Sequence, residues 1–83
     1  MKNLQEKLKR LRWQCRRGML ELDLILQAFL DKSYLNLSPE DQDQFEQLLT
    51  YSDQVIYSYL IKRQPIASTR MQALVERVMN NGR

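Results

Sequence analysis

The stretch that decides the fold reads Arg16-Arg17-Gly18-Met19-Leu20-Glu21-Leu22-Asp23. Gly18 is the only glycine before position 82, and it stands between two helical patterns. Because glycine inside a helix costs about 0.8–1.0 kcal/mol relative to alanine, we expect it to mark their junction. There it would give the backbone a conformation closed to other residues, or let a partner's backbone come close. Arg17 and Glu21 bracket the next helical turn, and their spacing allows either docking of a partner or simple solvation.

Two amphipathic patterns flank this junction. The first helix is expected at residues 3–15, with an apolar stripe of Leu4, Leu8, Leu11 and Cys15. Trp13 lies off that stripe and either packs against the next helix or stays partly exposed. The second helix is expected at about residues 18–32, with a core face of Leu22, Ile25, Leu26 and Phe29, widened by Leu20, Leu24, Ala28 and Leu30. A helix apolar on most sides is central, so we expect the others to pack around it.

Three further helices follow, each with a start or stop signal. Ser38 before Pro39 predicts a helix N-terminus, and Ser52-Asp53 predicts another. We expect Lys62 and Arg63 in the last turn of the fourth helix, which Pro65 ends. The fifth helix begins near Ser68 or Thr69, and its C-terminal stop is Asn80-Asn81-Gly82. The predicted buried residues are Phe45, Leu48 and Leu49, then Val55, Ile56, Tyr59 and Leu60, then Met71, Leu74, Val75 and Val78. We expect Tyr57, off this stripe, to stay exposed.

The 83 residues predict one all-α domain, a compact five-helix fold spanning 1–83. Net charge is +3 but unevenly placed: +6 over residues 1–17, −7 over residues 18–53 and +4 over residues 54–83. Basic ends around an acidic middle favour compaction, and they differ from the uniform basic face of a nucleic-acid binder. Phosphate contacts by Lys7, Lys9, Arg10 and Arg12 are conceivable, but a solvated basic side of an amphipathic helix is favoured.

Several classes of function are excluded by what the chain lacks. It has no histidine, the usual general base and metal ligand, and Cys15 without histidine is a poor nucleophile. Two glycines cannot make a phosphate loop or a dinucleotide fingerprint. The acidic cluster of Asp41, Asp43 and Glu46 matches no calcium loop and is expected on a solvated helix side. We therefore expect no enzyme, no metal and no bound cofactor.

The membrane and secretory classes are disfavoured as well. No apolar run approaches the roughly 20 residues that span a bilayer, and no signal-peptide pattern opens the chain. Direct membrane insertion is therefore not expected. One cysteine suits a reducing compartment, so the expected location is the cytoplasm.

One known family carries the same order of residues around Gly18. The chain resembles the FAD assembly factor SdhE family, also known as YgfY or CptB, in the block Trp13-x-Cys15-Arg16-Arg17-Gly18-Met19-x-Glu21-Leu22-Asp23. The resemblance covers roughly residues 8–66 and continues through Leu37-Ser38-Pro39-Glu40-Asp41, Phe45, Leu48-Leu49, Ser52-Asp53, Tyr59-Leu60 and Pro65. Two departures lie away from the first block. Tyr59 stands where the family commonly has tryptophan, and the glycine that often precedes the proline is absent.

The resemblance implies a fold and a function. It implies a YgfY-like five-helix bundle that promotes covalent attachment of FAD to the flavoprotein subunit of succinate dehydrogenase, or in some bacteria of fumarate reductase. The R-G-x-x-E motif of the family falls on Arg17, Gly18 and Glu21. The partner-binding residues implied are Arg16, Arg17, Gly18, Met19, Glu21 and Asp23. A monomer without nucleic acid is expected.

Alternatives from other classes stay open at this point. One is a small antitoxin-like regulatory protein, and another is a basic nucleic-acid-binding helical module. For Arg17 and Glu21 we expect a role at an interface and none in the fold. Whether Glu21 influences proton movement or only docks the partner is not separated by sequence.

Overall fold

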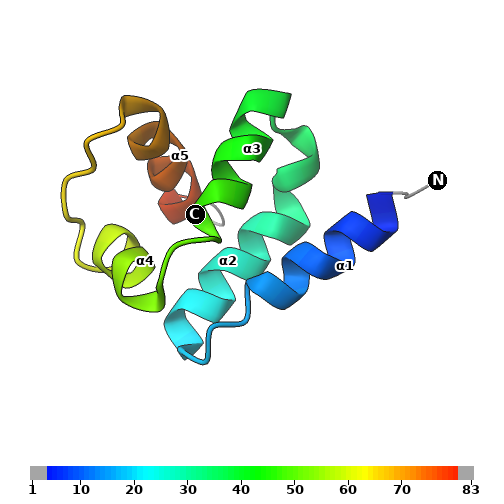
Figure 1. Ribbon diagram of the computed structural model, residues 1–83, viewed down its shortest axis with the longest axis horizontal. Helices are drawn as coiled ribbons and strands as arrows, with labels where there is room; N and C mark the ends of the chain where they lie inside the picture. The colour runs from blue at the N-terminus through cyan, green and yellow to red at the C-terminus, as the bar shows by residue number, and fades with distance from the viewer. Residues whose placement is uncertain (1–3, 81–83) are drawn as a thin grey trace.

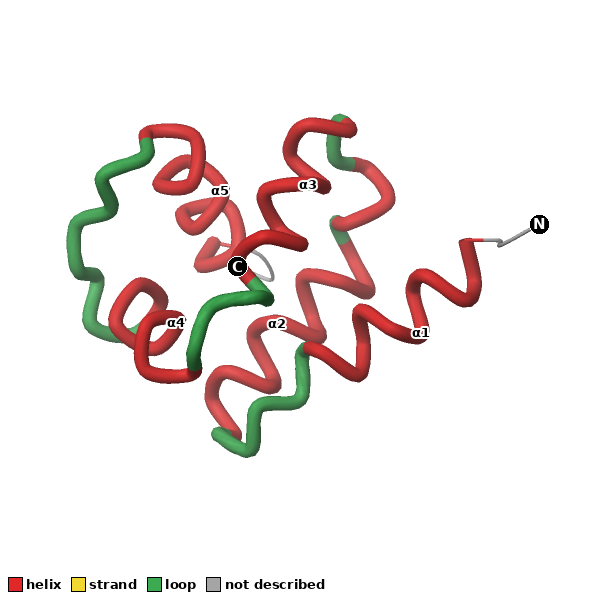
Figure 2. Tube along the Cα trace, viewed as in Figure 1, coloured by secondary structure: helices red, strands yellow, loops and turns green. Residues whose placement is uncertain are grey.

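The computed structural model describes residues 4–80, and within them the chain is helical and contains no strand. Figure 1 shows the helices in order, and Figure 2 shows the loops that join them. The elements are α1 (Leu4–Gln14), α2 (Leu20–Lys32), a short 3-10 helix η1 (Tyr34–Asn36), α3 (Pro39–Leu48), α4 (Asp53–Leu60) and α5 (Thr69–Asn80). The predicted all-α class is confirmed.

Helix α2 lies at the centre of the fold. It packs against α1, η1, α4 and α5, while α5 also packs against α3 and α4 (Figure 1). Its buried side chains are Leu22, Leu26, Phe29 and Leu30. The expectation that the other helices pack around α2 is therefore confirmed.

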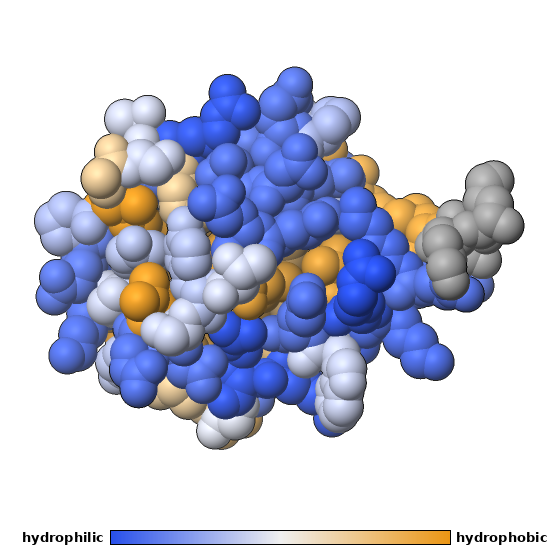
Figure 3. All heavy atoms as spheres, viewed as in Figure 1, coloured by the Kyte–Doolittle hydropathy of each residue, from blue (hydrophilic) through white to orange (hydrophobic). Residues whose placement is uncertain are grey.

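The apolar side of α2 is narrower than the sequence predicts. Leu20 is 73% exposed and Leu24 is 62% exposed, so both lie on the outer face of the helix. Charged and polar side chains cover most of the face seen in Figure 3, as expected when only one side of each helix is buried. Val55, expected in the core, is 37% exposed. Tyr59, also expected in the core, and Tyr57, expected at the surface, are both half-buried against the core.

Serine side chains begin three helices as predicted. Ser38 Oγ accepts a hydrogen bond from the Asp41 N–H at 3.2 Å. The hydroxyls of Ser52 and Ser68 do the same for the third residue after each, at 3.3 and 3.2 Å. Each bond satisfies a backbone donor that the helix itself leaves free.

The ends of two helices differ from the prediction. Helix α2 begins at Leu20, so Gly18 lies in the preceding loop. Helix α4 ends at Leu60, which leaves Lys62 and Arg63 beyond its last turn. Arg63 takes the left-handed φ of 58°, so the chain has turned before Pro65 is reached. Glycine adopts such a positive φ readily, whereas this chain has an arginine at the position. Part of the predicted stop at Asn80-Asn81-Gly82 lies outside the described residues.

A buried tyrosine of η1 that the sequence patterns did not single out shares a carboxylate of α3 with a lysine of α1. The Tyr34 hydroxyl donates to Glu46, and Lys7 Nζ lies 3.0 Å from the same carboxylate. Burial raises the pKa of Tyr34 to about 12, helped by the bond to Glu46. Burial alone would raise the pKa of Glu46, but the bonds from Tyr34 and Lys7 outweigh it and hold that pKa below its usual value. This carboxylate therefore stabilises the fold at neutral pH and loses that effect in acid.

The acidic cluster is thus more than a solvated surface. Glu46 is half-buried and bonded, and Asp41 Oδ2 lies 3.1 Å from Arg77 Nη1 of α5. Only Asp43 fits the expected exposed position.

The buried face of α2 gives the first prediction. Leu26 and Phe29 are fully enclosed, and the Phe29 ring lies 5.2 Å from that of Phe45. We expect Leu26→Ala and Phe29→Ala each to lower the free energy of unfolding by about 2–5 kcal/mol in urea titrations. Leu24→Ala, on the exposed side of the same helix, is the matched control and should stay within about 0.5 kcal/mol of wild type. Equal losses at all three positions would contradict this assignment of the core.

Candidate functional site

The loop between α1 and α2 turns at Gly18. Its φ is +81°, a left-handed conformation that side-chain-bearing residues rarely adopt. A Cβ placed at Gly18 would meet nothing within 4 Å. The glycine is therefore needed for its backbone conformation, while the space beside it is open to an approaching molecule. The first of its two predicted roles is confirmed.

Asp23 fixes this loop from inside the second helix. Its Oδ1 accepts a hydrogen bond from the Arg17 N–H at 2.7 Å. One turn of α2 is closed by the Asp23 N–H donating to the Met19 carbonyl at 2.9 Å. A carboxylate in the first turn also interacts favourably with the positive end of the helix dipole. Asp23 thus holds the loop and the start of α2 together.

The Arg17 side chain points into the molecule and joins two loops that are distant in sequence. Its guanidinium donates to the carbonyls of Leu49, at 3.1 Å, and Tyr51, both in the turn between α3 and α4. Nη1 also donates to the Gln14 carbonyl at 3.0 Å. Nε lies 3.0 Å from Asp53 Oδ1, an ion pair without a well-aligned hydrogen bond. With only 13% of the side chain exposed, the expectation that Arg17 has no part in the fold is wrong.

The outward side of the loop consists of other residues. Glu21 is exposed, and its side chain forms no hydrogen bond or ion pair with residues 4–80. Arg16 and Gly18 are exposed as well, and Met19 is half-buried against the core. We call Arg16, Gly18, Met19 and Glu21 the corner surface. Of the six predicted site residues, these four face outward or lie at the surface, whereas Arg17 and Asp23 hold the loop.

A hollow of about 300 Å³ adjoins the corner surface. Met19 forms one wall, and residues of α4 and its C-terminal turn form the other: Asp53, Gln54, Tyr57, Ser58 and Lys62. Because Arg17 pairs with Asp53, the same contact that sets the loop also brings the two walls together. The sequence predicts Asp53 only as part of a helix start. Its pairing with Arg17 has no local signal, because the two residues are 36 positions apart.

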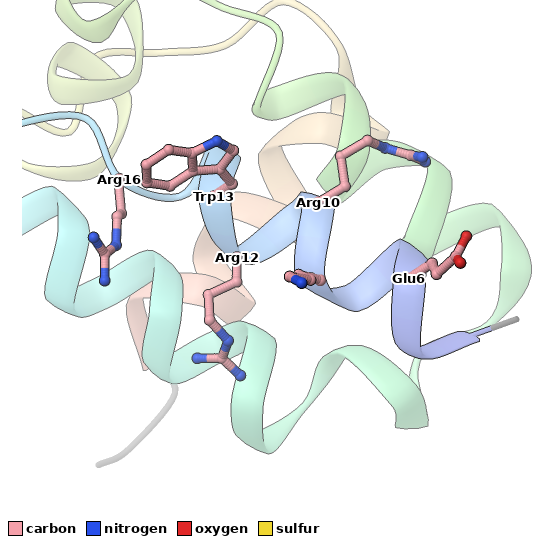
Figure 4. A pocket seen from close by; sticks show the side chains of 6 residues that line it. Glu6, Arg10, Arg12, Trp13 and Arg16 are labelled. Atoms are coloured by element: carbon pink, nitrogen blue, oxygen red, sulfur yellow. The ribbon is translucent and has the colours of Figure 1, made fainter.

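A second exposed feature covers the outer side of α1. Trp13 is 70% exposed, and the Arg16 guanidinium carbon lies 5.5 Å from the centre of its ring. An open hollow of about 630 Å³ is lined by Glu6, Lys9, Arg10, Arg12, Trp13 and Arg16. Figure 4 shows Arg12 extending towards α2, where it pairs with Asp31. Trp13 is therefore at the surface rather than packed against α2.

Cys15, the residue that follows α1, is fully buried. Burial raises the pKa of its thiol to about 12, against the smaller opposing effect of Arg12 and Arg17. The thiol is therefore protonated at neutral pH and unreactive. Within residues 4–80 no three acidic or cysteine side chains are grouped to hold a metal ion, and no described helix is long and apolar enough to cross a membrane.

The sequence is similar to a known family and to several named proteins. Residues 9–81 match the family described as "Flavinator of succinate dehydrogenase". The FAD assembly factor SdhE of Colwellia psychrerythraea is 40% identical over 70 residues, which cover 84% of this chain and 77% of that protein. The FAD assembly factor SdhE of Pseudomonas aeruginosa is 36% identical over 76 residues, covering 92% and 90%. That of Coxiella burnetii is 33% identical over 84% of this chain and 85% of its own. No solved structure gives a significant match.

The inward position of Arg17 gives the second prediction. Arg17→Ala should lower the free energy of unfolding by about 2–3 kcal/mol, because it leaves half-buried carbonyls without a charged donor. Its neighbour provides the matched control: Arg16→Ala should change the stability by no more than about 0.5 kcal/mol. Chemical denaturation of the two variants measures the difference. A stable Arg17→Ala variant would show that the contacts to Leu49 and Tyr51 are dispensable.

The buried thiol gives the third prediction. At neutral pH a disulfide reagent should label Cys15 in the folded chain about a hundredfold more slowly than in denaturant, since reaction requires opening of the fold. Labelling followed by absorbance checks the rate in both conditions. Rapid labelling of the native chain would contradict the enclosed, protonated state of the thiol.

Proposed function

This chain belongs to the family of succinate dehydrogenase flavinators, and we propose that it binds the flavoprotein subunit of succinate dehydrogenase and promotes covalent attachment of FAD to it. The observation that carries the proposal is the corner surface beside Gly18. There a left-handed glycine leaves open space, and Glu21 projects outward without a partner among the described residues. The same proposal extends to the flavoprotein subunit of fumarate reductase.

The six motif residues contribute in two ways on this proposal. Arg16, Gly18, Met19 and Glu21 contact the flavoprotein. Arg17 and Asp23 keep the loop in the shape that the partner recognises, through the bonds to the α3–α4 turn and to the loop backbone. The absence of a Cβ at Gly18 lets the partner's backbone come close to the loop.

The chain itself need not be an enzyme for this role. The isoalloxazine ring supplies the chemistry of the covalent bond to the partner. The chain's task is to bind the flavoprotein more tightly in the conformation that is ready for attachment, and so to raise its population. Correct alignment of reacting groups can contribute much of a barrier. With no histidine and a protonated thiol, the chain lacks two of the side chains most used for catalysis near neutral pH, which fits a positioning role.

Two further features belong to the proposal. A single copy of the chain presents the whole corner surface, so the proposed active form is a monomer. The proposed location is the cytoplasm, since a single unpaired cysteine is compatible with a reducing compartment.

Glu21 gives the fourth prediction. Because its side chain has no partner within residues 4–80, Glu21→Ala should melt within a few degrees of wild type, yet the rate of covalent flavin attachment should fall tenfold or more. Truncating one partner of a charge pair buried at an interface costs roughly 2–5 kcal/mol, which on this proposal is lost from the complex with the conformation that is ready for attachment. The assay mixes apo-flavoprotein, free FAD and the variant, and detects flavin fluorescence on the denatured flavoprotein in a gel.

Two comparisons sharpen this test. Asp43→Ala removes an exposed carboxylate on α3 and should leave attachment unchanged. Glu21→Gln keeps the shape but not the charge, so equal loss in both Glu21 variants indicates that the charge matters. Normal attachment with a folded Glu21→Ala variant would remove this residue from the proposal.

A further inference from the structure

Trp13 is the only tryptophan of the chain, and most of its surface is exposed at 70%. It is the largest apolar side chain, yet it packs beside Arg16 rather than in the core. Paired tryptophan and arginine side chains are the types most enriched among residues that dominate protein–protein binding. Neither the helix nor the core of this chain requires a tryptophan at that position.

The charges around Trp13 are mostly positive. Three basic residues of this part of the chain are paired internally: Lys7 with Glu46, Arg12 with Asp31, and Arg17 with Asp53. The other three, Lys9, Arg10 and Arg16, form no ion pair with residues 4–80. They line the open hollow together with Trp13. Figure 4 labels Arg10, Arg16 and Trp13 of this group. We call Lys9, Arg10, Trp13 and Arg16 the α1 face.

We propose that the α1 face is a second docking surface, which binds an acidic segment of the flavoprotein carrying an apolar side chain against Trp13. This rests on the proposed function and adds a division of labour to it. The α1 face supplies affinity, whereas the corner surface supplies the alignment that attachment requires. Arg16 belongs to both surfaces, and Trp13 is five positions from Gly18, so one partner can cover both.

Charge complementarity argues for an acidic protein segment rather than a nucleic acid. Three cations that form no ion pair within residues 4–80 can neutralise only a few phosphates, whereas steeply salt-dependent nucleic-acid binding involves roughly 6–10 such contacts. The carboxylate of Glu6 lines the same hollow. A second carboxylate, that of Asp31, pairs with Arg12, which is another residue of the lining. A regularly charged phosphate backbone would meet these carboxylates, but a short acidic segment can be placed to avoid them.

The division of labour predicts different kinetic effects for the two surfaces. Loss of binding alone raises the concentration of the factor needed for half-maximal attachment, and the plateau rate is recovered at high concentration. Loss of alignment lowers the plateau itself. Trp13→Ala should therefore raise the half-saturating concentration tenfold or more, whereas Glu21→Ala should lower the plateau.

The experiment titrates each variant against apo-flavoprotein and excess FAD at low and high salt. Arg70→Ala, an exposed arginine of α5, is the matched control and should behave as wild type. The double variant Lys9→Glu with Arg10→Glu should also raise the half-saturating concentration and remove most of its dependence on salt. A direct readout is the single fluorine resonance of wild-type chain labelled with 5-fluorotryptophan, which should shift on binding the flavoprotein.

Three outcomes separate the two proposals. If wild type promotes attachment but Trp13→Ala matches it and the fluorine resonance does not move, the α1 face is not a docking surface and the proposed function stands. If wild type neither binds the flavoprotein nor promotes attachment, both proposals fail. If the α1 variants lose binding to a DNA or RNA duplex while flavoprotein binding is unchanged, the occupant is a nucleic acid and the inference is overturned.

Discussion

The contacts of one guanidinium hold the α1–α2 loop in place. Arg17 joins that loop to the turn between α3 and α4 by donating to the carbonyls of Leu49 and Tyr51, and it pairs with Asp53 at the start of α4. A planar guanidinium can satisfy several acceptors at once, which lysine cannot do in the same geometry. Two segments more than thirty positions apart are thereby fixed relative to each other, together with the hollow between Met19 and α4.

This contact explains why arginine, glycine and glutamate occur together in one short motif. The Arg17 side chain points inward and fixes the loop. Gly18 gives the loop its left-handed turn, and the Glu21 side chain, one turn later, is exposed. Three residues that read as one charged exposed patch in the sequence therefore have three separate physical roles. On the proposed function, a substitution at Arg17 would act on the partner through the shape of the loop, which is a different effect from a substitution at Glu21.

The features that the sequence predicted well are local. A serine that accepts a bond from a backbone N–H three residues later needs only its own turn, so the starts of three helices followed from Ser38, Ser52 and Ser68. The core stripe of α2 followed from helical periodicity. Gly18 was located as a junction because an interior glycine is unfavourable in a helix.

The features that the sequence missed depend on tertiary contacts. Leu20 and Leu24 have the composition of core residues, but both are exposed on a side of α2 that no described helix covers. The inward direction of Arg17 is set by acceptors in a distant turn. Neither has a signature within a few residues of sequence. The end of α4 was missed for a different reason: its cap is local, with the Gln64 N–H donating to the Ser58 carbonyl at 2.9 Å, but arginine takes the positive φ there and glycine does not.

A site fixed before binding matters for a factor that acts by positioning. Ordering a flexible loop at an interface costs about 0.5–1.5 kcal/mol for each immobilised side chain, and that free energy is then lost from binding. Here Arg17 and Asp23 hold the corner loop in the free chain. On the proposed function, more of the binding free energy would therefore be available to favour one conformation of the flavoprotein over another. Since a factor shifts a conformational equilibrium only by its difference in affinity for the two states, a corner already held in the free chain would discriminate between them better than one that is ordered only on binding.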